Sequence, residues 1–176
     1  MLVVRQVGDL LFLFCNPRGH DDEMHGLSPA SEKEAIMDTA GNKDLARRLY
    51  TLINEGRVDQ VANLISPDYI EHDPLPGQGS GQEGVLDRFS MITTALAPQF
   101  TVEDLITERD RIVVRWTNRG THVGEFAGIP ATGRAFTIAG IDIYRVADEQ
   151  LCEHWHVIDQ LGMLAQLGLL PQPAAA

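Results

Sequence analysis

The segment CEHWHVID near the C-terminus gathers side chains that can take part in acid–base chemistry or bind a metal. Glu153 and Asp159 supply carboxylates, and His154 and His156 supply imidazoles two residues apart. Carboxylates and imidazoles are common general acids and bases in enzymes. The two histidines and Cys152 would bind a metal only if all three converged, and no fourth ligand is visible. We therefore expect no metal here, and an outer face or a subunit interface for the histidines.

Two stretches of strand-like sequence must position these groups. Residues 100–124 and 135–159 are rich in β-branched and aromatic side chains, which favour strands. Asp110–Arg111 and Asp148–Glu149 lie where tight turns would divide each stretch into two strands. The sequence thus predicts two antiparallel hairpins.

The second hairpin predicts which side chains share a face. With a two-residue turn at Asp148–Glu149, Tyr144 pairs with Glu153 and Asp142 pairs with Trp155. Side chains alternate along a strand, so a mixed polar and aromatic face separates from a second face. The first face carries Asp142, Tyr144, Glu153, Trp155, Val157 and Asp159, and the second carries Ile141, Ile143, Arg145, Cys152, His154, His156 and Ile158. We expect the first face to line a ligand pocket; a slip of one residue would exchange the faces.

The first half of the chain has helical periodicity. Residues 42–55 predict an amphipathic helix with Asn42 as the N-cap and Gly56 as the stop, residues 58–65 a shorter helix, and residues 84–96 a third. Between them, Pro67 and a turn-rich segment predict a long loop. That loop contains GSGQEG, which follows no buried strand and so is read as a flexible connection to the third helix rather than a dinucleotide site. Helices before strands favour an α+β fold, with the helices covering one face of a curved sheet.

Length and composition limit the number of domains. A chain of 176 residues that is 44% hydrophobic can bury one good core. We expect an N-terminal extension over residues 1–40, peripheral or flexible, with Met24 or Met37 as alternative starts. The domain proper covers residues 41–170, and a short tail covers residues 171–176. The apolar run at residues 10–14 is too short to span a bilayer and lacks a signal-peptide cleavage pattern.

Charge and cysteine content exclude several kinds of partner. The formal net charge of −11 would repel nucleic acid and anionic membrane surfaces, so neither is an expected partner. The two cysteines, Cys15 and Cys152, are far apart and match no disulfide framework or metal spacing. A reducing, cytoplasmic location fits best.

A longer pattern carries a family resemblance. The stretches YIEHDPLPGQGSGQEG and DRIVVRWTNRGTHVGEFAGIPATGRAFTIAGIDIYRVADEQLCEHWHVIDQLGMLAQLG resemble the SnoaL-like polyketide cyclases, also called predicted ester cyclases, of the NTF2-like superfamily. The resemblance covers roughly Asp44 to Gly168. It implies a cone-shaped α+β fold, a curved antiparallel sheet whose concave face the helices cover, a hydrophobic pocket between sheet and helices, and a homodimer or homotetramer.

The resemblance also implies an activity. The family's cyclases close a ring of a polyketide-like ester by an intramolecular aldol reaction, an isomerase or lyase type of chemistry, without metal or organic cofactor. Their aspartate acid/base would fall on Asp159, which partial desolvation beside Trp155 would suit to the task. The alternative for Asp159 is the N-cap of a helix formed by QLGMLAQLG.

The remaining candidates would bind the small hydrophobic or aromatic substrate. Some would donate hydrogen bonds to a developing oxyanion and others would sandwich an aromatic ring. They are His72, Trp116, His122, Phe126, Asp142, Tyr144 and Trp155. Because the same fold hosts isomerases, dehydratases, epoxide hydrolases and non-catalytic binders of small apolar ligands, those functions stay open as alternatives.

Overall fold

The computed structural model of the protein describes residues 3–7, 10–14 and 39–170. The first two segments are strands β1 (Val3–Val7) and β2 (Leu10–Phe14), which pair antiparallel with Val3 opposite Phe14. Residues 39–40 of the expected extension belong to the first helix of the domain. Residues 1–2, 8–9 and 15–38, which include Cys15 and both alternative starts, and the expected tail lie outside the described residues. No helix in the described part of the chain is both long enough and apolar enough to cross a bilayer.

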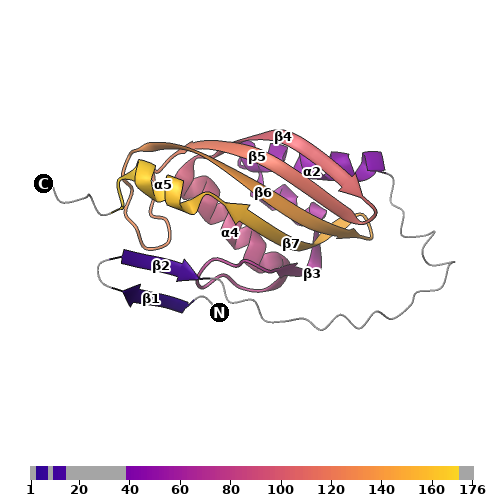
Figure 1. The fold of residues 1–176 in the computed structure, drawn as a ribbon. Coiled ribbons are helices and arrows are strands. Elements are labelled where there is room, and N and C mark those ends of the chain that lie inside the picture. Colours follow the sequence, from indigo (N-terminus) through magenta and orange to yellow (C-terminus); the bar gives the residue numbers. More distant parts are fainter. Residues whose placement is uncertain (1–2, 8–9, 15–38, 171–176) are drawn as a thin grey trace, which may run out of the picture.

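Residues 39–170 form a layer of helices against a five-stranded sheet with strand order β3–β7–β6–β5–β4. The strands are β3 (Ile65–Glu71), β4 (Gln99–Glu108), β5 (Arg111–Thr121), β6 (Ala135–Ala147) and β7 (Gln150–Ile158). The helices are α2 (Thr39–Asn54), α3 (Val58–Val61), the 3₁₀ turn η1 (Ala62–Leu64), α4 (Gly81–Leu96) and α5 (Gln160–Leu167). Helices α2 and α4 lie side by side over one face of the curved sheet (Figure 1). The expected α+β fold with helices over the concave face is confirmed.

The hydrophobic core fills the space between α2 and the inner face of the sheet. Leu49 and Ile53 recur on one side of α2 at helical spacing, and they are buried with Ile112 and Val114 of β5. The inward positions of β6 alternate with exposed ones over nearly its whole length. Burial of these apolar side chains is the main force holding the helical layer on the sheet.

The start of α2 differs from the prediction, while its end agrees with it. The helix begins at Thr39, so Asn42 lies inside it and is fully buried rather than capping it. The Asn42 side chain Nδ2 donates to the carbonyl of Arg109 in the β4–β5 turn, at 3.1 Å. Gly56 has a φ of +69°, a conformation that favours glycine and stops the helix as expected.

The region predicted as a long loop contains a strand. Strand β3 runs parallel to β7, with Ile70 opposite Glu153 and Glu71 opposite His154. The sheet is therefore mixed, and the prediction of a purely antiparallel sheet was wrong. Pro67 obscured the strand, yet a proline is tolerated because β3 lies at the edge of the sheet.

The two hairpin turns were predicted with unequal accuracy. The β6–β7 turn is Asp148–Glu149 as expected, with φ of +50° and +59°, as in the two-residue turns that favour hairpins. The β4–β5 turn is one residue earlier than expected. Glu108 pairs with Arg111, so the turn residues are Arg109 and Asp110.

A bulge in β7 overturns the predicted face assignment. Ala147 pairs with Gln150, but beyond an irregularity at Val146 and Leu151 the partners become Arg145 with Glu153, Tyr144 with His154, and Asp142 with His156. Cys152 is the extra residue, and its thiol lies 3.2 Å from the carbonyl oxygen of Arg145. One inserted residue reverses every side chain that follows it on that strand.

After the bulge, His154 and His156 point to the inner face with Asp142 and Tyr144. Trp155 pairs with Ile143 and Val157 with Ile141, on the outer face. Ile158, predicted to share the face of Ile141 and Ile143, instead packs against the core. The predicted pairing of Tyr144 with Glu153 and of Asp142 with Trp155 was wrong for this reason.

Candidate active site

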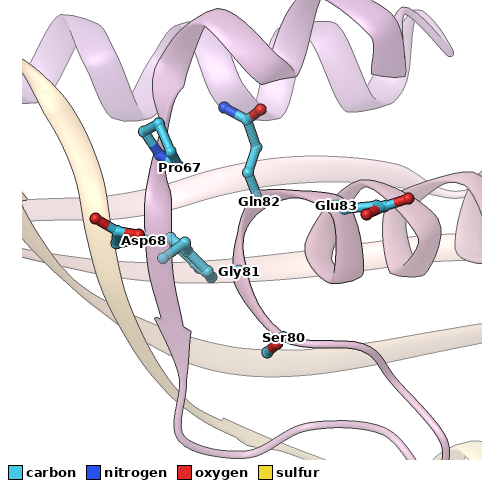
Figure 2. Close-up of a pocket in the computed structure, with 7 residues that line it drawn as sticks. Pro67, Asp68, Ser80, Gly81, Gln82 and Glu83 are labelled. Atoms are coloured by element: carbon cyan, nitrogen blue, oxygen red, sulfur yellow. The ribbon is translucent and has the colours of Figure 1, made fainter.

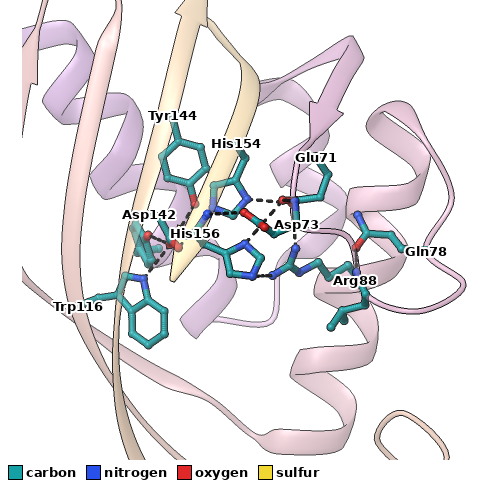
Figure 3. Close-up of polar contacts among 11 residues, drawn as sticks. Glu71, Asp73, Gln78, Arg88, Trp116, Asp142, Tyr144, His154 and His156 are labelled. Atoms are coloured by element: carbon teal, nitrogen blue, oxygen red, sulfur yellow. Dashed lines mark hydrogen bonds and ion pairs between the residues drawn. The ribbon is translucent and has the colours of Figure 1, made fainter. Parts of the chain in front are cut away.

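A buried polar cluster lies where the inner face of β7 meets α4. We call it the inner cluster; its members come from β3, α4, β6 and β7 and are Glu71, Arg88, Asp142, His154 and His156 (Figure 3). The β7 bulge and the parallel pairing of β3 bring these side chains together.

His154 lies between two carboxylates. Its Nδ1 is 2.8 Å from Oε2 of Glu71, and its Nε2 is 3.3 Å from Oδ1 of Asp142. Burial alone would lower the pKa of His154, but the hydrogen bonds and negative charges of Asp142 and Glu71 raise it to about 9. His154 is therefore an imidazolium at neutral pH.

Glu71 is held as an anion by its neighbours. Burial would raise its pKa, but the hydrogen bond from His154, the nearby Nδ1 of His156 and the positive charges of His154 and Arg88 bring the pKa well below its usual range. Arg88 donates from Nη1 to Oε2 of Glu71 at 2.9 Å, and both side chains are almost completely buried.

Asp142 accepts hydrogen bonds from three aromatic residues. Trp116 donates from Nε1 at 2.8 Å, Tyr144 from its hydroxyl at 3.3 Å, and Tyr50 through a short hydroxyl contact. Burial would raise the pKa of Asp142, but the hydrogen bonds of His154 and Tyr50 and the positive charges of His154 and His156 hold it below its usual value. Gly140 makes room for Trp116, since a Cβ there would lie 2.2 Å from the indole ring.

His156 is the ring of the inner cluster that is held least tightly. Its Nε2 is 3.4 Å from Nη2 of Arg88, near the limit of a hydrogen bond. Its Nδ1 faces Oε1 of Glu71 at 3.6 Å and has no hydrogen-bond partner among the described residues. The backbone N–H of His156 donates to Asp73 at 3.1 Å, which fixes the strand without a hydrogen bond to the ring.

Three of these groups have the chemistry of a metal site. Glu71, His154 and His156 each present one ligand atom, and these atoms lie within 4.8 Å of one another. One carboxylate and two imidazoles are a set that zinc accepts. However, the anions Glu71 and Asp142 are already balanced by the cations Arg88 and His154. A metal would have to displace both positive charges, so the arrangement favours acid–base chemistry by the protein groups themselves.

In the described part of the chain, neither of two prominent surface hollows is lined by a residue of the inner cluster. The larger, of about 580 Å³, lies between β3 and the start of α4 and is lined by Pro67, Asp68, Tyr69 and residues 80–83 (Figure 2). The other, of about 460 Å³, borders α2 and the β6–β7 turn. Side chains of the inner cluster are only 6–9% exposed. A substrate would therefore have to displace a side chain to reach them.

Three of the predicted substrate-binding residues lie at the inner cluster. Trp116, Asp142 and Tyr144 are buried together there, with Tyr144 stacked on His154 at a ring distance of 4.6 Å. The prediction placed Asp142 and Tyr144 on one inward face, and they share one. Trp116 contributes a hydrogen bond to Asp142 from within the core.

Two other predicted residues meet on the outer face. Trp155 stacks on His72 with ring centroids 4.3 Å apart, and Arg111 lies over the same indole at 4.9 Å. We call these three residues the outer stack. His72 Nε2 is also 3.2 Å from Glu153. The prediction that Trp155 faces a cavity beneath the helix at residues 42–55 was wrong, because the bulge turns it outward.

Asp159 lies just beyond β7 and caps α5. Its Oδ1 accepts a hydrogen bond from the backbone N–H of Gly162 at 2.8 Å, and the residue is exposed. The expectation that Asp159 faces the cavity with Trp155 is contradicted. The alternative role as an N-cap is the one that its geometry shows.

His122 and Phe126 lie in the connection between β5 and β6. His122 is buried, and its Nδ1 is 3.2 Å from the hydroxyl of Thr132. Phe126 is partly buried at the edge of the core. No described contact joins either residue to the inner cluster.

Sequence reasoning missed Glu71 and Arg88. Glu71 was hidden because its strand was read as loop. The position of Arg88 could have been predicted from helical spacing. It follows Val85 by three residues and precedes Ile92 by four, so it lies on the apolar side of α4. A charged residue at such a position needs a buried partner.

Comparisons with known proteins agree with this architecture. The family model described as SnoaL-like polyketide cyclase matches residues 43–167. The aklanonic acid methyl ester cyclase DnrD of Streptomyces peucetius is 32% identical over 132 residues, covering 71% of this chain and 89% of that protein. The nogalonic acid methyl ester cyclase of Streptomyces nogalater is 28% identical over 123 residues, covering 68% and 92%. The structure of TsrD from Streptomyces laurentii superposes with a TM-score of 0.70 at 32% identity, covering 76% of this chain and 99% of that one.

Proposed function

Because the chain belongs to the SnoaL-like polyketide cyclase family, we propose that it closes a ring in a polyketide-like ester by an intramolecular aldol reaction. Relatives at 28–32% identity that span over two thirds of the chain are named as methyl ester cyclases of aklanonic and nogalonic acid. Their names support a methyl ester as the substrate and ring closure as the reaction. A small, aromatic character of the substrate is proposed on the resemblance given above. No metal or organic cofactor is required by this reaction.

His156 is the proposed general base. Within the inner cluster Glu71 and Asp142 are stabilised as anions and His154 as a cation, so each would resist a change of protonation. His156 lacks such tight partners, and an imidazole can both accept a proton and return it. This contrast in how tightly the four groups are held is the observation that carries the proposal.

The proposed steps conserve atoms and electrons. Nε2 of His156 removes a proton from the carbon next to a substrate carbonyl, and the C–H electron pair forms an enolate. The enolate carbon attacks an internal ketone, forming the C–C bond while the ketone oxygen becomes an alkoxide. The alkoxide then takes the proton from Nε2, which restores the neutral imidazole. Glu71, facing Nδ1 at 3.6 Å, stabilises the transient imidazolium.

Asp159 remains the alternative acid/base. It follows the same strand as His156, and the resemblance assigned the family's aspartate to it. Its present hydrogen bond to Gly162 would have to break before it could act. Substitution of each residue separately distinguishes the two assignments.

The experiment that tests the function is a conversion assay. Purified protein is incubated with aklanonic acid methyl ester and, separately, with nogalonic acid methyl ester. Because an aldol closure rearranges atoms without changing the mass, products are separated by chromatography and identified by NMR. Enzyme-dependent formation of a ring-closed isomer supports the proposal; recovery of unchanged ester in both assays, with a folded protein, contradicts it for these substrates.

We also propose that the outer face of the sheet joins subunits of a homodimer or homotetramer. Four large apolar side chains are exposed there by 37–74%, namely Ile106, Ile141, Ile143 and Val157. Contiguous apolar surface of this kind is typical of interaction sites. A cytoplasmic location is proposed on the sequence grounds given above.

A further inference from the structure

Arg88 occupies a position that the proposed reaction does not yet explain. It reaches from α4 toward β7, its side chain is 7% exposed, and it touches both Glu71 and His156 (Figure 3). A buried arginine is costly unless it is paired, and Glu71 supplies that pairing. The second contact, to the proposed base, needs a separate reason.

The contact with His156 determines where the imidazole proton lies. A guanidinium only donates hydrogen bonds, so Nε2 of His156 must be the acceptor and the ring proton lies on Nδ1, facing Glu71. Arg88 therefore covers the lone pair that would remove the substrate proton. A substrate can reach Nε2 only after Nη2 of Arg88 moves.

The two contacts of Arg88 differ in length. Nη1 is 2.9 Å from Glu71, whereas Nη2 is 3.4 Å from His156. The first is a charge-assisted bond of ordinary length and the second is near the limit of a hydrogen bond. Breaking the contact with His156 therefore costs less free energy than breaking the contact with Glu71.

We propose that Arg88 is a catalytic residue that exchanges His156 for the substrate's carbonyl oxygen and stabilises the enolate. Nη1 stays on Glu71 as an anchor, while Nη2 donates to the oxygen on which negative charge develops. The same displacement uncovers Nε2 of His156, so oxyanion stabilisation and exposure of the base occur together. This inference rests on the proposed function and assigns the site an anionic, enolate-like ligand.

Charge favours the exchange at the moment of reaction. When His156 takes the proton, it becomes a cation beside Arg88 and no longer accepts its hydrogen bond. The enolate formed at the same time is an anion that needs a donor in a site with little water. Arg88 then neutralises the enolate while Glu71 faces the new imidazolium, so the inner cluster stays balanced.

The first test measures oxyanion binding without turnover. The probe is 4-nitrophenol, whose ionised form absorbs at longer wavelength than its neutral form. We expect the native protein to bind the phenolate in preference to the phenol, and Arg88→Met to lose that preference by roughly tenfold or more. Arg115→Met is the control, because Arg115 pairs with Asp104 on the exposed edge of the sheet. Equal phenolate binding by native protein and Arg88→Met would overturn the inference.

The second test uses the ester cyclised by the native protein. If Arg88 stabilises the enolate, Arg88→Lys should lower kcat roughly 10²–10³-fold with a smaller change in KM, because a lysine can pair with Glu71 but lacks the second donor arm. Added guanidinium chloride at millimolar concentration should partly restore kcat in Arg88→Ala. A purely structural Arg88 predicts that Arg88→Lys keeps the native kcat, and that result would overturn the inference.

The two proposals fail in different ways. If the native protein cyclises no ester, the ring-closure proposal fails, while 4-nitrophenolate binding still decides whether Arg88 receives an oxyanion. If the native protein cyclises an ester and Arg88→Lys does so equally well, only the role of Arg88 fails. Thermal melts identify a variant that does not fold; Arg88→Lys, which preserves the charge beside Glu71, then supplies the binding comparison.

Discussion

The two faces of the β6–β7 hairpin differ in which side chains they bury and which they expose. The inner face buries charged groups, and the outer face exposes Ile141, Ile143 and Val157 to solvent. Burying charge is unfavourable unless every group is paired, and exposing apolar surface is unfavourable unless something covers it. Neither arrangement favours the stability of an isolated subunit. The contrast suggests chemistry on the inner face and association on the outer one.

The largest expected effect separates two adjacent residues of β7. His156→Gln should lower turnover by about two to four orders of magnitude, the usual worth of a positioned general base, while the fold persists. Trp155→Phe, one residue earlier and on the outer face, should retain most of the activity because it keeps an aromatic ring against His72. Steady-state kinetics on the converted ester measures both. Comparable activity in His156→Gln and native protein would remove His156 as the base.

The second prediction compares a buried ion pair with a partly exposed one. Glu71→Gln should lower the free energy of unfolding by about 3–5 kcal/mol, because Arg88 and His154 lose their buried counter-ion. Glu153→Gln, whose partners His72 and Arg145 lie on the outer face, should lower it by about 1 kcal/mol or less. Urea unfolding followed by circular dichroism measures both values. Equal losses would show that the two faces do not differ in how their charges are held.

The third prediction concerns pH. The pKa of His154 rises from an ordinary 6.5 to about 9 on folding. Below pH 6.5 its ion pairs therefore contribute fully to the free energy of unfolding. That contribution should be lost as the pH rises from 6.5 through 9, on the order of 3 kcal/mol in all. The pKa of Glu71 is lowered from 4.5, so its contribution is lost in the opposite direction, as the pH falls below 4.5. Unfolding free energies across this range should decline less steeply in His154→Gln; an unchanged slope would contradict the assignment.

The fourth prediction concerns Asp159, at the end of the strand where the two faces stop. Asp159→Ala should destabilise the protein by about 1 kcal/mol, because the N–H of Gly162 loses its acceptor, whereas Asp159→Asn should be nearly neutral. Turnover of Asp159→Asn should stay within a factor of a few. Thermal melts and kinetics on both variants check this, and a hundredfold loss of turnover in Asp159→Asn would return the acid/base role to Asp159.

The smallest effect on folding is expected on the outer face. Ile143→Lys places a charge on a residue that is already 37% exposed, so the stability of a single subunit should change by about 0.5 kcal/mol or less. If this face joins subunits, the same substitution should shift sedimentation from oligomer toward monomer at micromolar concentration. A native protein that is monomeric at that concentration would contradict the assembly proposal.

Local pattern determined the elements and part of the site. Helical spacing in α2, alternation in β5 and β6, and the Asp148–Glu149 turn were all readable, because each depends on neighbours within a few residues. The resemblance of residues 44–168 gave the family and, with it, the helix-covered cone. Asp142 and Tyr144 were correctly placed on one inward face, since they are two residues apart on a regular strand.

Tertiary structure decided what those elements bring together. The bulge at Cys152 leaves no mark on the local alternation of residues, and that one residue determines whether His156 or Trp155 faces inward. Glu71 entered the site because an edge strand containing proline pairs parallel with β7, a contact between residues over eighty positions apart. Arg88 faces His156 only because α4 packs beside β3, which brings this side chain within reach of β7. Side-chain direction has a period of two, so a register that only packing can select also determines the chemistry.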